Sequence, residues 1–161
     1  MRLAALTLLA FSLSVSAVPA GLAGATGSSL LIEDGRGVVV VKGKGVLIGH
    51  IDKGSLEITD LTPSDQWSPY VNGVPRGKVV WIRANKVSIN FRVPGGRYRI
   101  VARGEGISIS ARGTGQSTID PDPDPVGEAG RYSVGDAALQ ELPADPVRLS
   151  FGVPDVAPSA P

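Results

Sequence analysis

Apolar and polar positions alternate along most of the chain, which is the period of strands that bury one face. Short glycine-bearing turns separate the alternating runs, and 136–142 (DAALQEL) is the one candidate for a helical turn. The pattern predicts an all-β, antiparallel protein. The expected strands lie at about 28–33, 36–42, 45–52, 54–61, 77–83, 86–93, 96–103, 106–112, 114–119, 131–134 and 146–152.

A weak internal repeat relates residues 35–58 to residues 96–119 at a constant spacing of 61. The positions identical in both copies are Gly35, Arg36, Gly43, Gly45, Ile48, Gly54 and Ile58. Glycine-rich strands match easily by chance, so duplication and coincidence both remain open. The repeat implies a three-stranded meander used twice, at 28–61 and 77–119, with 62–75 as the connecting loop. Two such units must bury their apolar faces on each other, which predicts a β-sandwich or flattened barrel, with a β-solenoid as the alternative.

The amino-terminal segment has the features of a secretory signal peptide. A short positive start at residues 1–2 precedes an apolar run at 3–18, and the small residues 23–25 fit a cleavage site. The run is shorter than the roughly 20 residues that span a bilayer, and no later segment resembles a span. We therefore expect a signal peptide at 1–25, a single β domain at 26–152, a disordered tail at 153–161, and a secreted, extracellular or cell-envelope location.

The composition removes several kinds of chemistry. The chain has 161 residues, no cysteine, one histidine and one methionine. Disulfides, thiolate metal sites and a cysteine nucleophile are therefore excluded. No GxSxG, HExxH or paired-carboxylate motif occurs either. We expect a non-enzymatic protein without a metal or another cofactor.

The net charge of +1 hides a division along the chain. Residues 26–119 carry 13 basic and 7 acidic side chains, a net of +6, whereas residues 120–161 carry 2 basic and 8 acidic, a net of −6. The acidic segment, expected to hold the final strands at 120–152, opens with alternating Asp and Pro at 120–125. Alternating carboxylates occur at the start of calcium loops, but the prolines and the missing loop glycine favour a stiff acidic strut over a metal site.

Turns at 94–95 and 104–105 would place the apolar residues of the second meander on one face, with Phe91 opposite Tyr98 and Ala102 opposite Ile107. The other face would then gather six basic residues and one tryptophan. We predict a ligand-binding surface made of Trp81, Lys86, Arg92, Arg97, Arg99, Arg103 and Arg112. Like charges in opposite positions destabilise a sheet. Either the acidic segment 120–161 covers this face, or an external polyanion does.

The external partner would be an anionic cell-wall polymer, an acidic glycan or another envelope protein, and nucleic acid is not expected. The first meander differs, because the expected register makes it apolar on both sides. Val39, Val41, Val46 and Ile48 would line one face, and Val38, Val40, Leu47 and Ile51 the other. A doubly apolar unit must be covered by the acidic segment or by another subunit. A structural or self-assembling envelope protein is therefore the alternative function.

Two further features have competing interpretations. His50 could serve a hydrolase, the second alternative, but the repeat places it at the position of Ala111, opposite Gly37, where it would only fill volume. Trp67 and Tyr70 lie in the connecting loop beside polar residues. They could form a secondary glycan site, or the loop could plug the open end of the sandwich.

Overall fold

The computed structural model describes residues 28–77, 79–84, 87–123 and 130–152. Within these ranges the protein is all-β and contains no helix, and its antiparallel sheet curls into a half-barrel. The predicted fold class is confirmed. The expected helical turn at 136–142 is wrong, because residues 140–141 form a short strand instead. The expected signal peptide, 1–25, and tail, 153–161, lie outside the described residues.

Two strands are far longer than the alternation predicted. The ten strands of the sheet are β1 (Ser29–Ile51), β2 (Lys53–Asp60), β3 (Tyr70–Val71), β4 (Val74–Pro75), β5 (Val79–Ala84), β6 (Ile89–Val93), β7 (Arg97–Pro121), β8 (Arg131–Val134), β9 (Gln140–Glu141) and β10 (Val147–Phe151). The three strands expected at 28–33, 36–42 and 45–52 are one continuous strand, β1. The three expected at 96–103, 106–112 and 114–119 are likewise β7.

The hairpins expected at 94–95 and 104–105 are wrong, and so are the two meanders. β6 pairs with β1 and β3, not with β7. β1 and β7 instead wind around each other, so that residues 38–44 of β1 pair with both 97–103 and 114–120 of β7. The glycines expected to end strands are places where the strand bends and continues.

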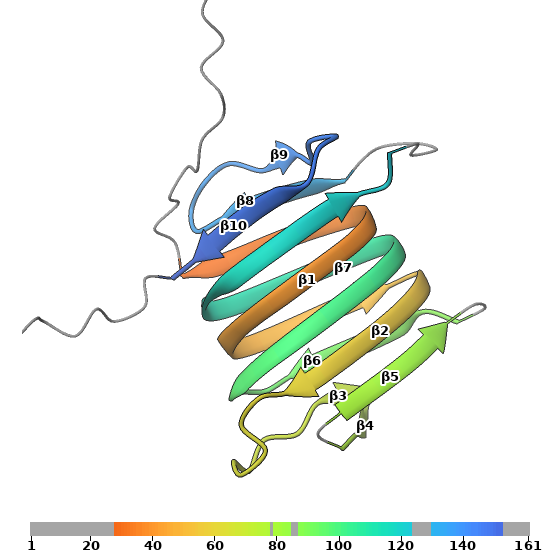
Figure 1. Cartoon of the computed structure of the whole chain (residues 1–161), viewed down its shortest axis with the longest axis vertical. Helices are drawn as coiled ribbons and strands as arrows, with labels where there is room; N and C mark the ends of the chain where they lie inside the picture. Colours follow the sequence, from red (N-terminus) through yellow and green to blue (C-terminus); the bar gives the residue numbers. More distant parts are fainter. Residues whose placement is uncertain (1–27, 78, 85–86, 124–129, 153–161) are drawn as a thin grey trace, which may run out of the picture.

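The sheet forms two layers, which Figure 1 shows as a stack of slanted ribbons. We call the nearer one in that view the front layer. It holds β10, residues 114–121 and 97–104 of β7, residues 37–44 of β1, β2 and β5. The back layer holds β9, β8, residues 29–33 and 46–51 of β1, residues 107–112 of β7, β6, β3 and β4. Each long strand therefore passes from layer to layer twice.

The crossings coincide with glycines of positive φ, at 37 and 45 in β1 and at 104, 106 and 113 in β7. Gly104 shows why glycine is needed. Its φ is +133°, and a Cβ there would overlap the carbonyl oxygen of Lys53 on the neighbouring strand. Only glycine combines this backbone conformation with such a close approach.

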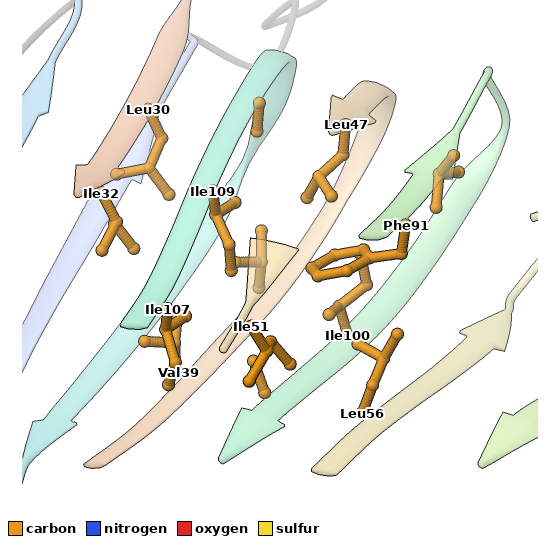
Figure 2. Packing of buried hydrophobic residues seen from close by; sticks show 14 of the residues in the cluster. Leu30, Ile32, Val39, Leu47, Ile51, Leu56, Phe91, Ile100, Ile107 and Ile109 are labelled. Carbon is orange, nitrogen blue, oxygen red and sulfur yellow. The ribbon is translucent and has the colours of Figure 1, made fainter. Parts of the chain in front are cut away.

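The core lies between the two layers, where side chains of both inner faces meet (Figure 2). The apolar residues expected inside the second meander are buried, among them Phe91, Tyr98 and Ile107. The double apolar face expected for the first meander is wrong. Val39, Val41, Leu47 and Ile51 all belong to the core, whereas Val46 and Ile48 are 44% and 56% exposed. The crossing at Gly45 reverses which alternate residues point inward.

The spacing of 61 reappears in the strand register. Val41 pairs with Ser117, and Leu56 pairs with Ala102; adding 61 to the first residue of each pair gives the other pair's second residue. The outer strands obey the same relation, with Ile58–Val80 matching Ile119–Val147, and Leu30–Val134 matching Phe91–Val71. The fold therefore has an approximate twofold relation between residues 28–84 and residues 89–152, which favours duplication over coincidence.

The acidic segment does not lie over either layer where it is described. β8 extends the back layer beside β1, and β10 extends the front layer beside β7, each through backbone pairing. Asp120 continues β7 opposite Val38, and the backbone N–H of Asp122 donates to the carbonyl oxygen of Arg36 (3.2 Å). Part of the expected strut, 124–125, lies outside the described residues.

Candidate anion-binding face

The outer surface of the front layer gathers basic side chains from two strands. Lys42 and Lys44 project from β1, and they lie directly opposite Arg99 and Arg97 of β7. Arg103 follows on β7, opposite Val38 and Ser55. All of these side chains are exposed except Arg99, which is half-buried. We call Lys42, Lys44, Arg97, Arg99 and Arg103 the basic face.

Alternation explains why these residues point outward. Val39 and Val41 of β1, and Tyr98, Ile100 and Ala102 of β7, face the core. Their neighbours along each strand must therefore point to solvent. Val101 also points outward and yet is fully buried without joining the core cluster. The aliphatic stems of long basic side chains commonly cover such positions.

One carboxylate partly neutralises the basic face. Glu57 of β2 accepts a hydrogen bond from Arg99, with 3.2 Å between Oε1 and Nη1. The two side chains are 33% and 42% exposed, so solvent weakens this ion pair. No ion pair of Lys42, Lys44, Arg97 or Arg103 with another described residue is found within 4.0 Å.

One end of the basic face is hollowed into a groove of about 300 Å³. Its charged lining residues are Lys42, Lys44 and Arg97. Its neutral lining residues are Gly43, Leu61, Thr114, Gly115, Gln116, Ser150 and Gly152. We call this hollow the basic groove.

The floor of the basic groove is backbone. Gly43 and Gly115 pair directly across β1 and β7, and both of these glycines turn their α-hydrogens toward the core. The ring of Phe151 fills the space below, because a Cβ on Gly43 would lie 3.4 Å from its Cζ. Tyr98, also opposite Gly43, is 1% exposed. Two large aromatic residues thus support a floor that has no side chains of its own.

The predicted ligand-binding residues fall into two groups. Arg97, Arg99 and Arg103 share the basic face as expected. Arg92 of β6 and Arg112 of β7 lie in the back layer, so their expected place on the same face is wrong. The crossing between Arg103 and Arg112 carries the strand to the other layer, which a hairpin would not do.

The two remaining members of the predicted surface are only partly placed. Trp81 occupies a register position in β5 opposite Glu57, at the edge of the front layer. Lys86 lies outside the described residues.

The sequence reasoning missed Lys42 and Lys44. Their alternation with Val39 and Val41 was visible, but the meander model put the first repeat against a cover. The strand register instead brings β1 between two segments of β7. Treating the repeat as two interlocked units rather than two separate ones would have placed these lysines beside Arg97 and Arg99.

His50 does not face Gly37, so the volume-filling interpretation is wrong. It lies in the back layer opposite Asn90 and Ser108, with a side chain 37% exposed. Its Nδ1 lies 2.8 Å from Oδ1 of Asn90, and its Nε2 lies 2.8 Å from Oδ1 of Asp52. Phe91 pairs with Gly49 while its counterpart Leu30 pairs with Ala111, so the repeat spacing is 62 here.

The hydrogen bonds of His50 differ from those of a nucleophile-activating histidine. Both partners accept, so the ring must donate from both nitrogens, and hydrogen bonding first to Asn90 and then to Asp52 raises its pKa. Such a ring holds its protons rather than removing one from a hydroxyl. Ser108 instead accepts a hydrogen bond from the backbone N–H of Asp34 (3.2 Å).

Trp67 and Tyr70 are not brought together into one site. The indole of Trp67 packs on the backbone of Gly95 and is 44% exposed, at the loop between β2 and β3. Tyr70 begins β3 in the back layer, where the guanidinium of Arg92 lies 5.0 Å from the centre of its ring. The contact with Gly95 matches a loop that packs against the end of the half-barrel.

The described ranges contain no cluster of three or more His, Cys, Asp or Glu residues placed to hold a metal ion. They also contain no helix that is both long and apolar enough to cross a membrane. The chain matches no family model, no curated protein and no solved structure. The argument about function therefore depends on the geometry alone.

Proposed function

We propose that this protein is a secreted or cell-envelope, non-enzymatic β module that binds an anionic polymer or acidic glycan through the basic face. The observation that carries this proposal is the register of Lys42 opposite Arg99 and of Lys44 opposite Arg97. Two successive like-charged pairs stand side by side on the outer surface. Only Glu57 offers a printed counter-charge, and it contacts Arg99.

Each like-charged pair destabilises the folded sheet, by a magnitude comparable to the roughly 0.2–1 kcal/mol that an opposite-charged pair contributes. The acidic segment could remove this cost by covering the face. Where it is described, it extends the edges of the layers instead. An external polyanion would turn the unfavourable pairs into favourable contacts.

The spacing of the charges suits a linear polymer. Neighbouring outward residues on one strand lie about 7 Å apart, and neighbouring strands about 4.8 Å apart. Lys44 and Lys42 on β1, with Arg97 and Arg99 on β7, therefore form two parallel rows. A chain with regularly repeated negative groups can contact several of them at once, which raises affinity through multiple weak contacts.

The test is binding to immobilised polyphosphate and heparin, with neutral dextran as the control, across a series of salt concentrations. We expect binding whose affinity falls steeply with salt, because released counterions drive such association. The double variant Lys42→Gln/Arg99→Gln should weaken binding about tenfold or more. Arg112→Gln, an exposed arginine of the back layer, is the control and should change it less than about threefold. Binding that ignores salt, or no binding to either polyanion, would overturn the proposal.

Self-assembly is the second candidate, and one observation favours it. β5 pairs with β2 on one side and forms an edge of the front layer. Its sequence, VVWIRA, is apolar and rich in strand-forming residues, which makes an edge prone to pairing with another chain. Sedimentation velocity over a wide concentration range tests this candidate. A monomer at every concentration would rule it out.

A further inference from the structure

We infer that the basic groove is a discrete site for a phosphoryl group, such as the phosphate of a phosphate-bearing polymer or of its monomer. This inference rests on the proposed function, because the basic groove is one end of the basic face. It adds that binding is not spread evenly over the face. One anionic group is held at a defined place.

Three cationic side chains from two strands line the basic groove, which has a volume of about 300 Å³. This is the lower end of the range of ligand sites, about 300–1,000 Å³. Lys42 and Lys44 are adjacent outward residues of β1, and Arg97 lies directly opposite Lys44. Thr114, Gln116 and Ser150 add neutral hydrogen-bonding groups on the side away from Arg97.

The nearest carboxylates lie on the other side of Arg97, in the loop after β2. Oδ1 of Asp60 accepts a hydrogen bond from the backbone N–H of Thr62 (2.8 Å), and Oδ2 of Asp65 accepts one from the Thr62 hydroxyl (2.7 Å). Neither aspartate is among the residues that line the basic groove. An anion in the groove therefore meets three positive groups and no lining carboxylate.

The internal repeat supplies a comparison within the molecule. At a spacing of 61, Lys42, Lys44 and Arg97 correspond to Arg103, Glu105 and Arg36. Thr59 and Leu61 correspond to Asp120 and Asp122. The same corner of the fold thus carries three acids in one copy and none at those positions in the other. The concentration of positive charge is a property of these particular residues and does not follow from the architecture.

The arrangement favours phosphate over carboxylate. A carboxylate is planar and singly charged, and one arginine fork satisfies both of its oxygens. Here three separate cationic heads lie around one hollow, and two of them are lysines, which act as point charges on phosphate. A phosphate monoester carries more negative charge at neutral pH and offers three oxygens in different directions.

The test follows glycerol 3-phosphate binding by NMR, through the backbone amides of Gly43, Gly115 and Gly152 in the groove, with malonate as the carboxylate comparison. Two variants carry the same change of charge on the same face. Lys44→Glu places in the groove the residue found at the equivalent corner, and Arg103→Glu lies outside the groove. Both positions are exposed, and circular dichroism checks that each variant folds.

We expect glycerol 3-phosphate to shift the three amides, with Kd rising about tenfold or more in Lys44→Glu and less than about threefold in Arg103→Glu. Equal weakening in both variants would overturn the discrete site, and so would malonate binding as tightly as glycerol 3-phosphate. Absence of these shifts, with polyphosphate still bound, would overturn the inference and leave the proposed function standing. Loss of polyanion binding in the unchanged protein would instead refute the proposed function.

Discussion

Tyr98 lies directly opposite Gly43 across the β1–β7 ladder, and its hydroxyl is buried without a hydrogen-bond partner among the described residues. An unpaired buried hydroxyl destabilises the folded state because it loses its contacts with water. We expect Tyr98→Phe to raise the free energy of unfolding by about 1 kcal/mol, measured by urea denaturation. A loss of stability would show that the hydroxyl has a partner.

The same residue predicts a difference at high pH. Burial raises the pKa of Tyr98 to about 12 in the folded state, from an ordinary value of 10.0. The unfolded chain therefore releases this proton first, and the contribution of Tyr98 to stability is present below pH 10 and lost as the pH rises toward 12. Between pH 9 and 12 the unchanged protein should lose more stability than Tyr98→Phe does. Parallel curves for the two proteins would contradict this.

His50 should make stability depend on pH near neutrality. Its hydrogen bonds to Asn90 and Asp52 raise its pKa above 6.5, so the folded state binds this proton more tightly than the unfolded chain. The resulting stabilisation is complete below pH 6.5 and is lost as the pH rises through the folded pKa. An NMR titration should give a pKa above 6.5 in the folded protein. Asp52→Asn should lower it, and an unchanged or higher value in that variant would contradict the assignment.

Gly49 lies opposite Phe91, and a Cβ at Gly49 would overlap the buried phenyl ring. We expect Gly49→Ala to lower the free energy of unfolding by about 1–3 kcal/mol, because the ring must move within a packed core. Gly77→Ala is the control, since no atom lies within 4 Å of a Cβ there. The double variant Gly49→Ala/Phe91→Leu should lose less than the two single variants combined, measured by thermal or urea unfolding.

Glu57 should oppose anion binding, because it is the carboxylate that contacts Arg99. Glu57→Gln frees this arginine, and the affinity for polyphosphate should rise about two- to fivefold at low salt. Stability should change by less than about 1 kcal/mol, since a partly exposed ion pair contributes little. Glu141→Gln, at an exposed position of β9 in the back layer, is the control for net charge. An equal gain in both variants would mean that only the overall charge matters.

The sequence predicted the fold class because alternation depends on local physics. Val39, Val41, Ile100 and Ile107 are buried, as the period of two requires. It failed at the glycines, because a glycine at 104 or 45 can end a strand or bend one, and only long-range packing decides between them. Each bend moved the next segment to the other layer. Arg112 therefore left the predicted surface, and Ile48 left the core.

The binding residues were half predicted for the same reason. Arg97, Arg99 and Arg103 share one uninterrupted segment of β7, so alternation alone places them together. Lys42 and Lys44 come from a segment more than 50 residues away, and their place between two segments of β7 depends on the winding of the strands. The outward direction of these lysines could be read from the sequence, but their neighbours could not.

The winding of β1 and β7 also constrains how the chain can fold. Residues 38–44 of β1 have β7 on both sides, and residues 108–112 of β7 have β1 on both sides. Neither repeat can complete a layer before the other is present, so nearly all pairings close loops of tens of residues. Proteins dominated by such distant pairings fold slowly, in milliseconds to seconds. The same entanglement should resist local opening from the middle, so that unfolding begins at β5 or β10, where one side of the strand is free.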